Sequence, residues 1–155
     1  MNIRTANISD IDKILILEEQ VFKLHYNARP DLIDKEKSPN SYEFLRKCIE
    51  SDNGKIFIAE IDENIIGHCI INIKEIKNHH IYFDMMNIEI DDMCIDEKHR
   101  KKGIGKKLFE EVIKFSKEKG IKRLELGVWE FNENAIKFYE CLGMKTKYRR
   151  MELEL

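Results

Sequence analysis

The sequence predicts an α/β fold in which helices pack on the faces of a mixed β-sheet. Runs rich in β-forming residues alternate along the chain with segments whose apolar residues recur at the helical period. The resulting order is β-α-α-β-β-β-α-β-α-β. The chain has 155 residues and shows no Gly/Ser-rich linker and no internal repeat. We therefore expect a single domain over residues 1–155.

The elements are placed by their apolar period and by the residues that start and stop them. The expected strands are residues 2–6, 55–61, 65–76, 86–95, 123–128 and 144–155. The expected helices are residues 10–26, 42–53, 105–119 and 133–142. Ser9 is a typical N-cap, Gly120 and Gly143 are typical of helix ends, and Pro30 and Pro39 bracket a long loop.

The last expected strand carries apolar residues on both parities. Met144, Thr146 and Tyr148 alternate on one side, whereas Met151, Leu153 and Leu155 take the other, which indicates a bulge or a break near Arg149–Arg150. An uncovered edge strand of this kind invites another chain. A homodimer is the expected consequence.

Composition excludes several classes of function. Lys and Arg number 27 against 29 Asp and Glu, and this balance argues against a dedicated nucleic-acid binder. The longest stretch without a charged residue, residues 64–73, is too short to cross a membrane. The cysteines are scattered, without a metal-binding spacing, so reduced thiols, a cytoplasmic location and no bound metal are expected. They are Cys48, Cys69, Cys94 and Cys141.

Charge is most unevenly placed between residues 84 and 107. Acidic residues fill the strand, and six bases without an acid follow in ten residues, from Lys98 to Lys107. Within them, the run Arg100-Lys101-Lys102-Gly103-Ile104-Gly105 lies between a strand and a helix, which is typical of a cradle for a pyrophosphate. A solvated basic loop is the alternative. The spacing matches neither a P-loop nor a dinucleotide fingerprint, because Leu108 replaces the third glycine.

A second motif follows on the last helix, Asn132-x-x-Ala135-x-x-x-Tyr139-x-x-x-Gly143. Together, Arg100-x-x-Gly103-x-Gly105 and this motif resemble the signature of the GNAT family of acetyl-CoA-dependent N-acetyltransferases. The resemblance extends in element order over nearly the whole chain. It implies a mostly antiparallel sheet with a splayed central strand pair and helices on both faces.

The resemblance also implies how acetyl-CoA is held. The backbone of Met93, Cys94 and Ile95 would receive the pantetheine arm, and the loop would wrap the pyrophosphate. The loop residues are Arg100, Lys101, Lys102, Gly103, Ile104, Gly105 and Lys106. Asn132 would lie beside the cofactor, a role compatible with that of an N-cap.

Two residues are implied as catalytic. The phenol of Tyr139 would protonate the departing thiolate, and Glu89 would take the proton of the attacking amine, with Asp91 and Asp92 as alternatives on the same strand. Direct transfer to a primary amine is expected, whereas a covalent route through Cys94 lacks an activating histidine in the sequence pattern.

The acceptor is expected to be a small amine or a peptide. Family members that acetylate protein N-termini tend to carry an acid where this chain has Gly127, which disfavours such a substrate. Specificity would come from residues 18–42, whose acids favour a cationic amine. The polar and aromatic residues there are Glu18, Glu19, His25, Tyr26, Arg29, Asp31 and Asp34. The alternative function is a module that binds acyl-CoA without transferring the acyl group.

Overall fold

The computed structural model describes residues 1–37 and 41–155, so Pro39 lies outside the described residues. Its centre is a five-stranded sheet with the order β1-β2-β3-β4-β5. Adjacent strands are antiparallel except for β4 and β5, which are parallel. This confirms the mixed, mostly antiparallel sheet. The strands are β1 (Asn2–Thr5), β2 (Gly54–Ile61), β3 (Asn64–Ile76), β4 (Met85–Ile95) and β5 (Leu124–Leu126).

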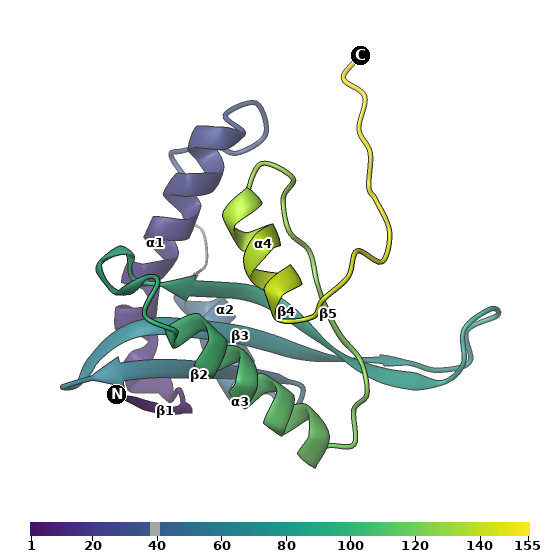
Figure 1. The fold of residues 1–155 in the computed structure, drawn as a ribbon, viewed down its shortest axis with the longest axis horizontal. Helices are drawn as coiled ribbons and strands as arrows, with labels where there is room; N and C mark the ends of the chain where they lie inside the picture. The colour runs from purple at the N-terminus through teal and green to yellow at the C-terminus, as the bar shows by residue number, and fades with distance from the viewer. Residues whose placement is uncertain (38–40) are drawn as a thin grey trace.

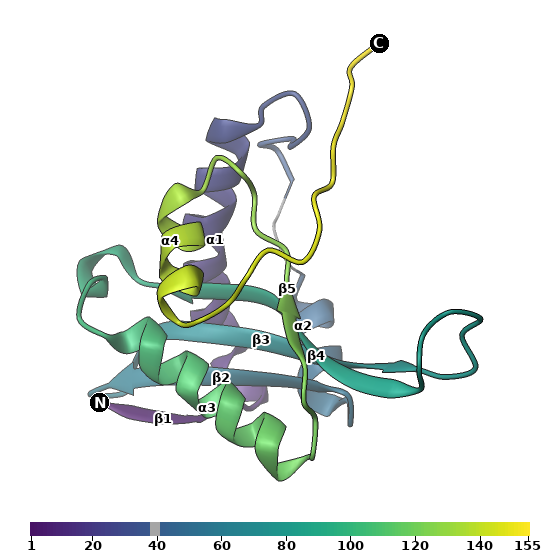
Figure 2. The ribbon, with the colours of Figure 1, turned by 45° about the vertical axis from the view of Figure 1, so that its right-hand side comes forward.

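Helices cover both faces of the sheet (Figures 1 and 2). On one face lie α1 (Ile11–Ala28) and α2 (Tyr42–Glu50), and on the other lie α3 (Ile104–Glu118) and α4 (Glu133–Cys141). Short 3-10 turns, Ile8–Asp10 and Glu97–His99, precede α1 and follow β4. In the described part of the chain, no helix is both long and apolar enough to span a bilayer.

Two apolar cores fix these layers, one on each face of the sheet. Against α1 and α2, the strands present side chains that include Ile56, Ile58 and Ile70, all fully buried. Against α3, they present Ile71 and Ile88. Successive side chains of a strand point to opposite faces, so one sheet serves both cores.

The central strand pair is splayed, as expected. The parallel ladder joins Ile88 to Leu124, Glu89 to Glu125 and Ile90 to Leu126, and there β5 ends. Because β4 continues to Ile95, its last residues have no strand neighbour on that side among the described residues. The ladder between β3 and β4 also shifts register between Ile70 and Ile71. A bulge at this shift presents consecutive side chains of β4 differently from regular alternation.

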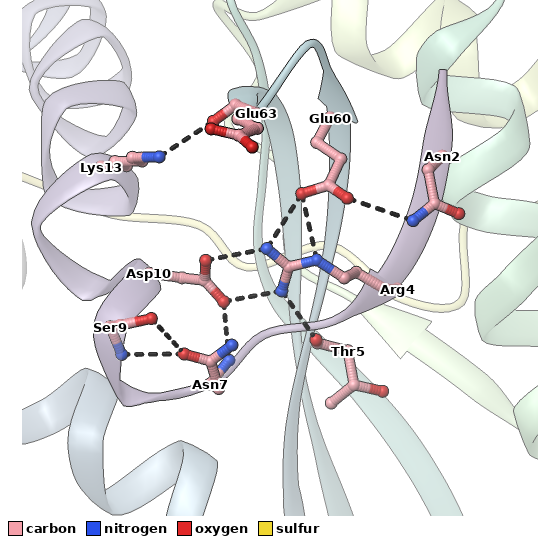
Figure 3. A network of polar contacts seen from close by, with 9 residues as sticks. All are labelled: Asn2, Arg4, Thr5, Asn7, Ser9, Asp10, Lys13, Glu60 and Glu63. Carbon is pink, nitrogen blue, oxygen red and sulfur yellow. Dashed lines mark hydrogen bonds and ion pairs between the residues drawn. The ribbon is translucent and has the colours of Figure 1, made fainter.

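A network of ion pairs holds the start of α1 on the sheet (Figure 3). The Arg4 guanidinium on β1 bonds both carboxylate oxygens of Asp10 at 2.8 and 2.9 Å and reaches Glu60 of β2 at 2.9 Å. We call Arg4, Asp10 and Glu60 the Arg4 cluster. The N-cap expected at Ser9 is wrong, because Asn7, two residues earlier, forms a capping box with Asp10.

The last expected strand is also wrong. Residues 144–155, here called the C-terminal tail, contain no strand and extend away from the body of the molecule (Figures 1 and 2). Two side-chain ion pairs at 2.7 Å hold the tail: Lys147 to Glu125 and Glu152 to Arg29. Strand pattern alone does not make a strand, because the backbone needs a neighbouring edge with which to form a ladder.

Candidate active site

A buried histidine joins two carboxylates between the sheet and α1. The Nε2 atom of His68, on β3, lies 2.8 Å from Oε1 of Glu18 and 2.8 Å from Oδ2 of Asp92. His68 is fully buried and Glu18 is 2% exposed, whereas Asp92, on β4, is only partly buried. We call these residues the His68 cluster. Of these three side chains, that of Asp92 is the one that reaches solvent.

The charge state of this cluster follows from its contacts. Burial alone would lower the pKa of His68, but its hydrogen bonds to Asp92 and Glu18 outweigh burial and raise the pKa to about 9. A neutral imidazole has at most one hydrogen to share at Nε2, and so does the cation. Two carboxylates therefore meet the same ring nitrogen.

The His68 cluster opens into a pocket of about 430 Å³ between α1 and β4. Its lining combines four acids with apolar and aromatic side chains and a single lysine. The lining residues are Glu18, Val21, Phe22, His25, Leu32, Ile33, Asp34, Lys37, Asp91 and Asp92. This lining favours a cationic molecule with an apolar body.

The three acids of β4 proposed as bases occupy different surroundings. Asp91 and Asp92 both line the pocket, because the bulge lies at these residues. Asp91 is hydrogen-bonded to Asn72, and burial raises its pKa. Glu89 does not line the pocket and lies 3.4 Å from Lys74, with 44% of its side chain exposed. The structure therefore groups Asp92, not Glu89, with the buried polar residues.

Tyr139 lies on the opposite face of β4. Its ring packs beside Phe109 and Phe138, and its hydroxyl lies 3.9 Å from the sulfur of Met93. Burial raises the pKa of Tyr139, and the negative charge of Asp92 acts in the same direction. The phenol is therefore protonated at neutral pH, next to the part of β4 that has no strand neighbour.

Cys94 faces the other way, into the layer between sheet and α1. Its thiol lies 3.4 Å from the carbonyl oxygen of Leu17 and is 3% exposed. Burial raises the pKa of this thiol to about 12. His68 stands opposite Cys94 in the strand register, but its Nε2 is engaged by the two carboxylates. A thiolate nucleophile is disfavoured here.

The basic loop connects β4 to the start of α3. Arg100 donates from Nε to the carbonyl oxygen of Ile95 at 3.0 Å and so ties the loop to the strand end. Lys101 and Gly103 adopt left-handed conformations, with φ of 60° and 78°. A Cβ atom at Gly105 would lie 3.1 Å from the Phe138 ring, so even alanine there would require this ring to shift by a few tenths of an ångström.

The loop leaves hydrogen-bond donors at the start of α3. The first intrahelical bond runs from Lys107 to Gly103, so the N–H groups of Ile104, Gly105 and Lys106 have no acceptor in the helix. Such groups suit a phosphate. Lys102 donates to the carbonyl oxygen of Lys98, and the Lys106 ammonium lies 3.8 Å from Glu110.

Asn132 caps α4, as one of its two expected roles requires. Its Oδ1 accepts a hydrogen bond from the N–H of Ala135 at 3.2 Å. The loop before it brings Trp129 and Phe131 against His25 of α1, with ring centroids 6.4 and 5.7 Å apart. This aromatic contact joins α1 to the loop that leads from β5 to α4.

Sequence reasoning missed His68 and the aromatic contact. A single histidine within an apolar strand carries no spacing signal, and only the register of β3 against β4 places it beside Asp92. The His68 cluster is also the only group of three metal-type ligands in the described part of the chain, with ligand atoms within 4.8 Å of one another. Its atoms are already paired with one another.

Comparison with known proteins agrees with this geometry. The model of the acetyltransferase (GNAT) family matches residues 19–144. An uncharacterized N-acetyltransferase of Lactobacillus delbrueckii subsp. lactis is 31% identical over 74% of this chain and 70% of its own length. The thialysine N-epsilon-acetyltransferase of Caenorhabditis elegans is 30% identical over 66% of this chain and 61% of its own.

Solved structures show the same fold. The tetramutant of the BH1408 protein from Bacillus halodurans is 27% identical, with a TM-score of 0.95 and full coverage of both chains. The chain spans less than two thirds of the length of several curated relatives, for example 46% of one and 34% of another. Since the family model covers most of the chain, including the splayed strands, the basic loop and α4, this protein belongs to the GNAT family of N-acetyltransferases.

Proposed function

We propose that the protein transfers the acetyl group of acetyl-CoA to a primary amine of a small cationic molecule, by direct attack. One observation carries the proposal: an acidic pocket lies on one face of β4 and the buried Tyr139 lies on the other, at the stretch where β4 and β5 separate. The pocket suits the amine, and the other face suits the thioester. The end of β4 lies between them.

Asp92 is the proposed proton acceptor. An alkyl amine with a pKa near 10.4 is almost fully protonated at neutral pH, so it must lose a proton before its lone pair can attack. Asp92 lines the pocket and directly precedes Met93–Ile95, the residues of β4 that extend beyond the ladder with β5. His68 and Glu18 act as positioning residues that hold its carboxylate. Glu89 and Asp91 remain the alternatives on this strand.

Tyr139 is the proposed proton donor. When the new C–N bond forms and the C–S bond breaks, the sulfur leaves as a thiolate and takes the phenolic proton. The raised pKa of Tyr139 keeps this proton in place until the thiolate appears. The Tyr139 hydroxyl lies 3.9 Å from the sulfur of Met93, a residue in the part of β4 that extends beyond the ladder with β5.

The loop residues fit coenzyme A. Acetyl-CoA supplies an acyl group activated as a thioester. The unpaired N–H groups at the start of α3 and the bases around them, Arg100, Lys101, Lys102 and Lys106, are proposed to bind its pyrophosphate. The N–H groups of Met93–Ile95 are proposed to bind the pantetheine arm and to stabilise charge on the thioester oxygen.

The acceptor is proposed to carry a second positive group besides the reacting amine. Four acids face one lysine in the pocket, so a dication gains more than a simple alkyl amine. The thialysine acetyltransferase relative, a lysine-analogue enzyme by its name, points to the same class of substrate. Diamines, basic amino acids and aminoglycosides are the candidates.

Turnover separates this proposal from a module that only binds acyl-CoA. The purified protein is incubated with acetyl-CoA and each candidate amine, thiol release is followed, and the product is identified by mass spectrometry. We expect release that depends on the amine and is lost in Asp92→Asn and in Tyr139→Phe. Binding of acetyl-CoA without acetylation of any cationic amine would favour the binding module.

A further inference from the structure

The acceptor pocket carries different charges at its two ends. Glu18, Phe22 and His25 lie about one turn apart on one side of α1, so the pocket runs along this helix. At the end near the sheet, the charged lining residues are Glu18 and two acids of β4, Asp91 and Asp92. At the other end lies the loop that follows α1, at the top of Figure 1. The two ends therefore take their charges from different elements.

The loop end of the pocket presents an acid and a base together. Asp34 and Lys37 both line the pocket and form the two ends of one turn, in which the N–H of Lys37 donates to the carbonyl oxygen of Asp34 at 3.1 Å. The N–H of Glu36 donates to Oδ1 of Asp34 at 3.0 Å and so orients this carboxylate. The Cα atoms at the two ends of such a turn lie less than about 7 Å apart. A carboxylate and an ammonium therefore extend from neighbouring positions at this end.

Lys37 supplies the positive charge of the described lining. The one histidine of that lining, His25, is neutral at neutral pH, because burial lowers its pKa below the ordinary value of 6.5. His68 lies behind the sheet end of the lining and is bonded to Glu18 and Asp92. An anionic group of a ligand is therefore repelled by three acids at the sheet end and attracted by Lys37 at the loop end.

We propose, on the basis of the acetyl transfer proposed above, that the acceptor is an α-amino acid with a cationic side chain. Its α-carboxylate lies at Lys37, its α-ammonium at Asp34 and its side-chain amine at Asp92. The α-carbon holds the first two charges on adjacent atoms, which suits the neighbouring acid and base of the turn. Diamines and aminoglycosides have no carboxylate, so Lys37 would face another cation in their complexes. The single lysine thus selects among the candidate amines.

The rest of the pocket suits the side chain of such an amino acid. Val21 and Phe22, between the two ends, offer apolar surface to its methylene groups, and the amine extends to Asp92. Of the two protons that the nitrogen loses in becoming an amide, one passes through Asp92 to solvent. The other balances the proton that Tyr139 gives to the leaving thiolate. The products are the amino acid acetylated on its side chain and free coenzyme A.

Two substrates that differ in one charge test the role of Lys37. Lysine and lysinamide have the same two amines, but lysinamide carries a neutral amide in place of the carboxylate. We expect the ratio of kcat/KM for lysine to that for lysinamide to fall about tenfold in Lys37→Gln, as for the loss of one charge-assisted pair. The matched control is Lys35→Gln, because Lys35 is an exposed residue of the same turn outside the pocket lining. It should keep the ratio of the intact protein.

Asp34→Asn tests the other half of the turn. Both substrates keep the α-ammonium, so this variant should lower kcat/KM for lysine and lysinamide by similar factors. Unchanged values would contradict the α-ammonium site. Fragmentation of the product in a mass spectrometer should locate the acetyl group on the side-chain nitrogen. Thermal unfolding shows that each variant is folded, since Asp34, Lys35 and Lys37 lie outside both cores.

The outcomes separate the amino-acid acceptor from the acetyl transfer on which it rests. Cadaverine is the analogue of lysine that lacks the carboxylate. If cadaverine is acetylated and lysine is not, or if Lys37→Gln leaves the ratio unchanged, the transfer stands and the amino-acid acceptor is wrong. Acetylation of lysine on its α-nitrogen would also overturn it. If acetyl-CoA binds but none of the three amines is acetylated, the proposed function fails as well.

Discussion

Two clusters of charged side chains contact α1, one at its start and one at Glu18 in its middle, and they differ in the group that pairs their carboxylates. In the Arg4 cluster, a guanidinium with five N–H groups bonds the carboxylates of Asp10 and Glu60, and Asn7 donates a further hydrogen bond to Asp10 (Figure 3). In the His68 cluster, two carboxylates share one ring nitrogen. The first cluster is held by a guanidinium that is always charged, and the second by an imidazole whose charge depends on pH.

This difference distinguishes a structural role from a chemical one. The Arg4 cluster is not expected to exchange protons at neutral pH, and its ion pairs connect β1, β2 and the start of α1. The His68 cluster borders a pocket and holds a carboxylate, Asp92, that can accept a proton. We therefore expect changes in the Arg4 cluster to affect stability and changes in the His68 cluster to affect turnover.

Asp92→Asn tests the chemical role most strongly. Loss of a general base typically costs a factor of about 10² to 10⁴ in turnover, and the amide keeps the size of the side chain. The measurement is kcat/KM for the best amine of the panel, with Glu89→Gln as the matched control on the same strand. If Glu89→Gln loses as much activity and Asp92→Asn little, Glu89 is the base and the pocket assignment fails.

Tyr139→Phe is expected to lower turnover by about 10²-fold, at the lower end for a general acid, because a thiolate leaves without full protonation. Coenzyme A affinity, measured by calorimetry, should be unchanged, since the ring is kept. The control is Tyr148→Phe on the exposed tail, which should be fully active. Full activity of Tyr139→Phe would remove the acid role.

Alkaline pH should destabilise the His68 cluster. The pKa of His68 is about 9 in the folded protein and 6.5 as its ordinary value. Its contribution to the free energy of unfolding is therefore complete below pH 6.5 and is lost as pH rises through 9. Urea unfolding between pH 6.5 and 9 should show a decline that His68→Gln lacks. Parallel profiles for the two proteins would contradict the protonated ring.

Acid should act on the Arg4 cluster instead. The hydrogen bonds from Arg4 lower the pKa of Asp10, so its contribution is present above the ordinary carboxylate pKa and is lost as pH falls through the folded value. Arg4→Met leaves Asp10 without its cation and should cost about 2 kcal/mol of unfolding free energy. Activity per folded molecule should be unchanged. Arg46→Met, at an exposed pair with Glu50, is the control and should change stability little.

Much of the fold could be predicted because its signals are local. The period of apolar residues and the glycines at helix ends placed every helix and the first five strands within a few residues of their observed bounds. The two-residue turn Asp62–Glu63, with both residues at positive φ, fixed the hairpin of β2 and β3. The basic loop was likewise visible, since its charge and glycines are consecutive.

The prediction failed where pairing decides structure. The alternation in residues 144–155 is a strand pattern, but a strand requires a ladder with a neighbour, and these residues form no ladder with the described strands. Ser9 failed as a cap for a smaller reason, because Asn7 and Asp10 form the reciprocal capping pair and the Ser9 hydroxyl donates to Oδ1 of Asn7.

The sequence by itself determined the order of elements, the family motifs and the tyrosine on α4, because each depends on residues close together in the chain. The tertiary structure alone decided which carboxylate meets His68. Glu18, His68 and Asp92 come from three separate elements, and the bulge in β4 sets which acids turn toward the pocket. Register between strands is a property of the assembled sheet, so no local pattern could supply it.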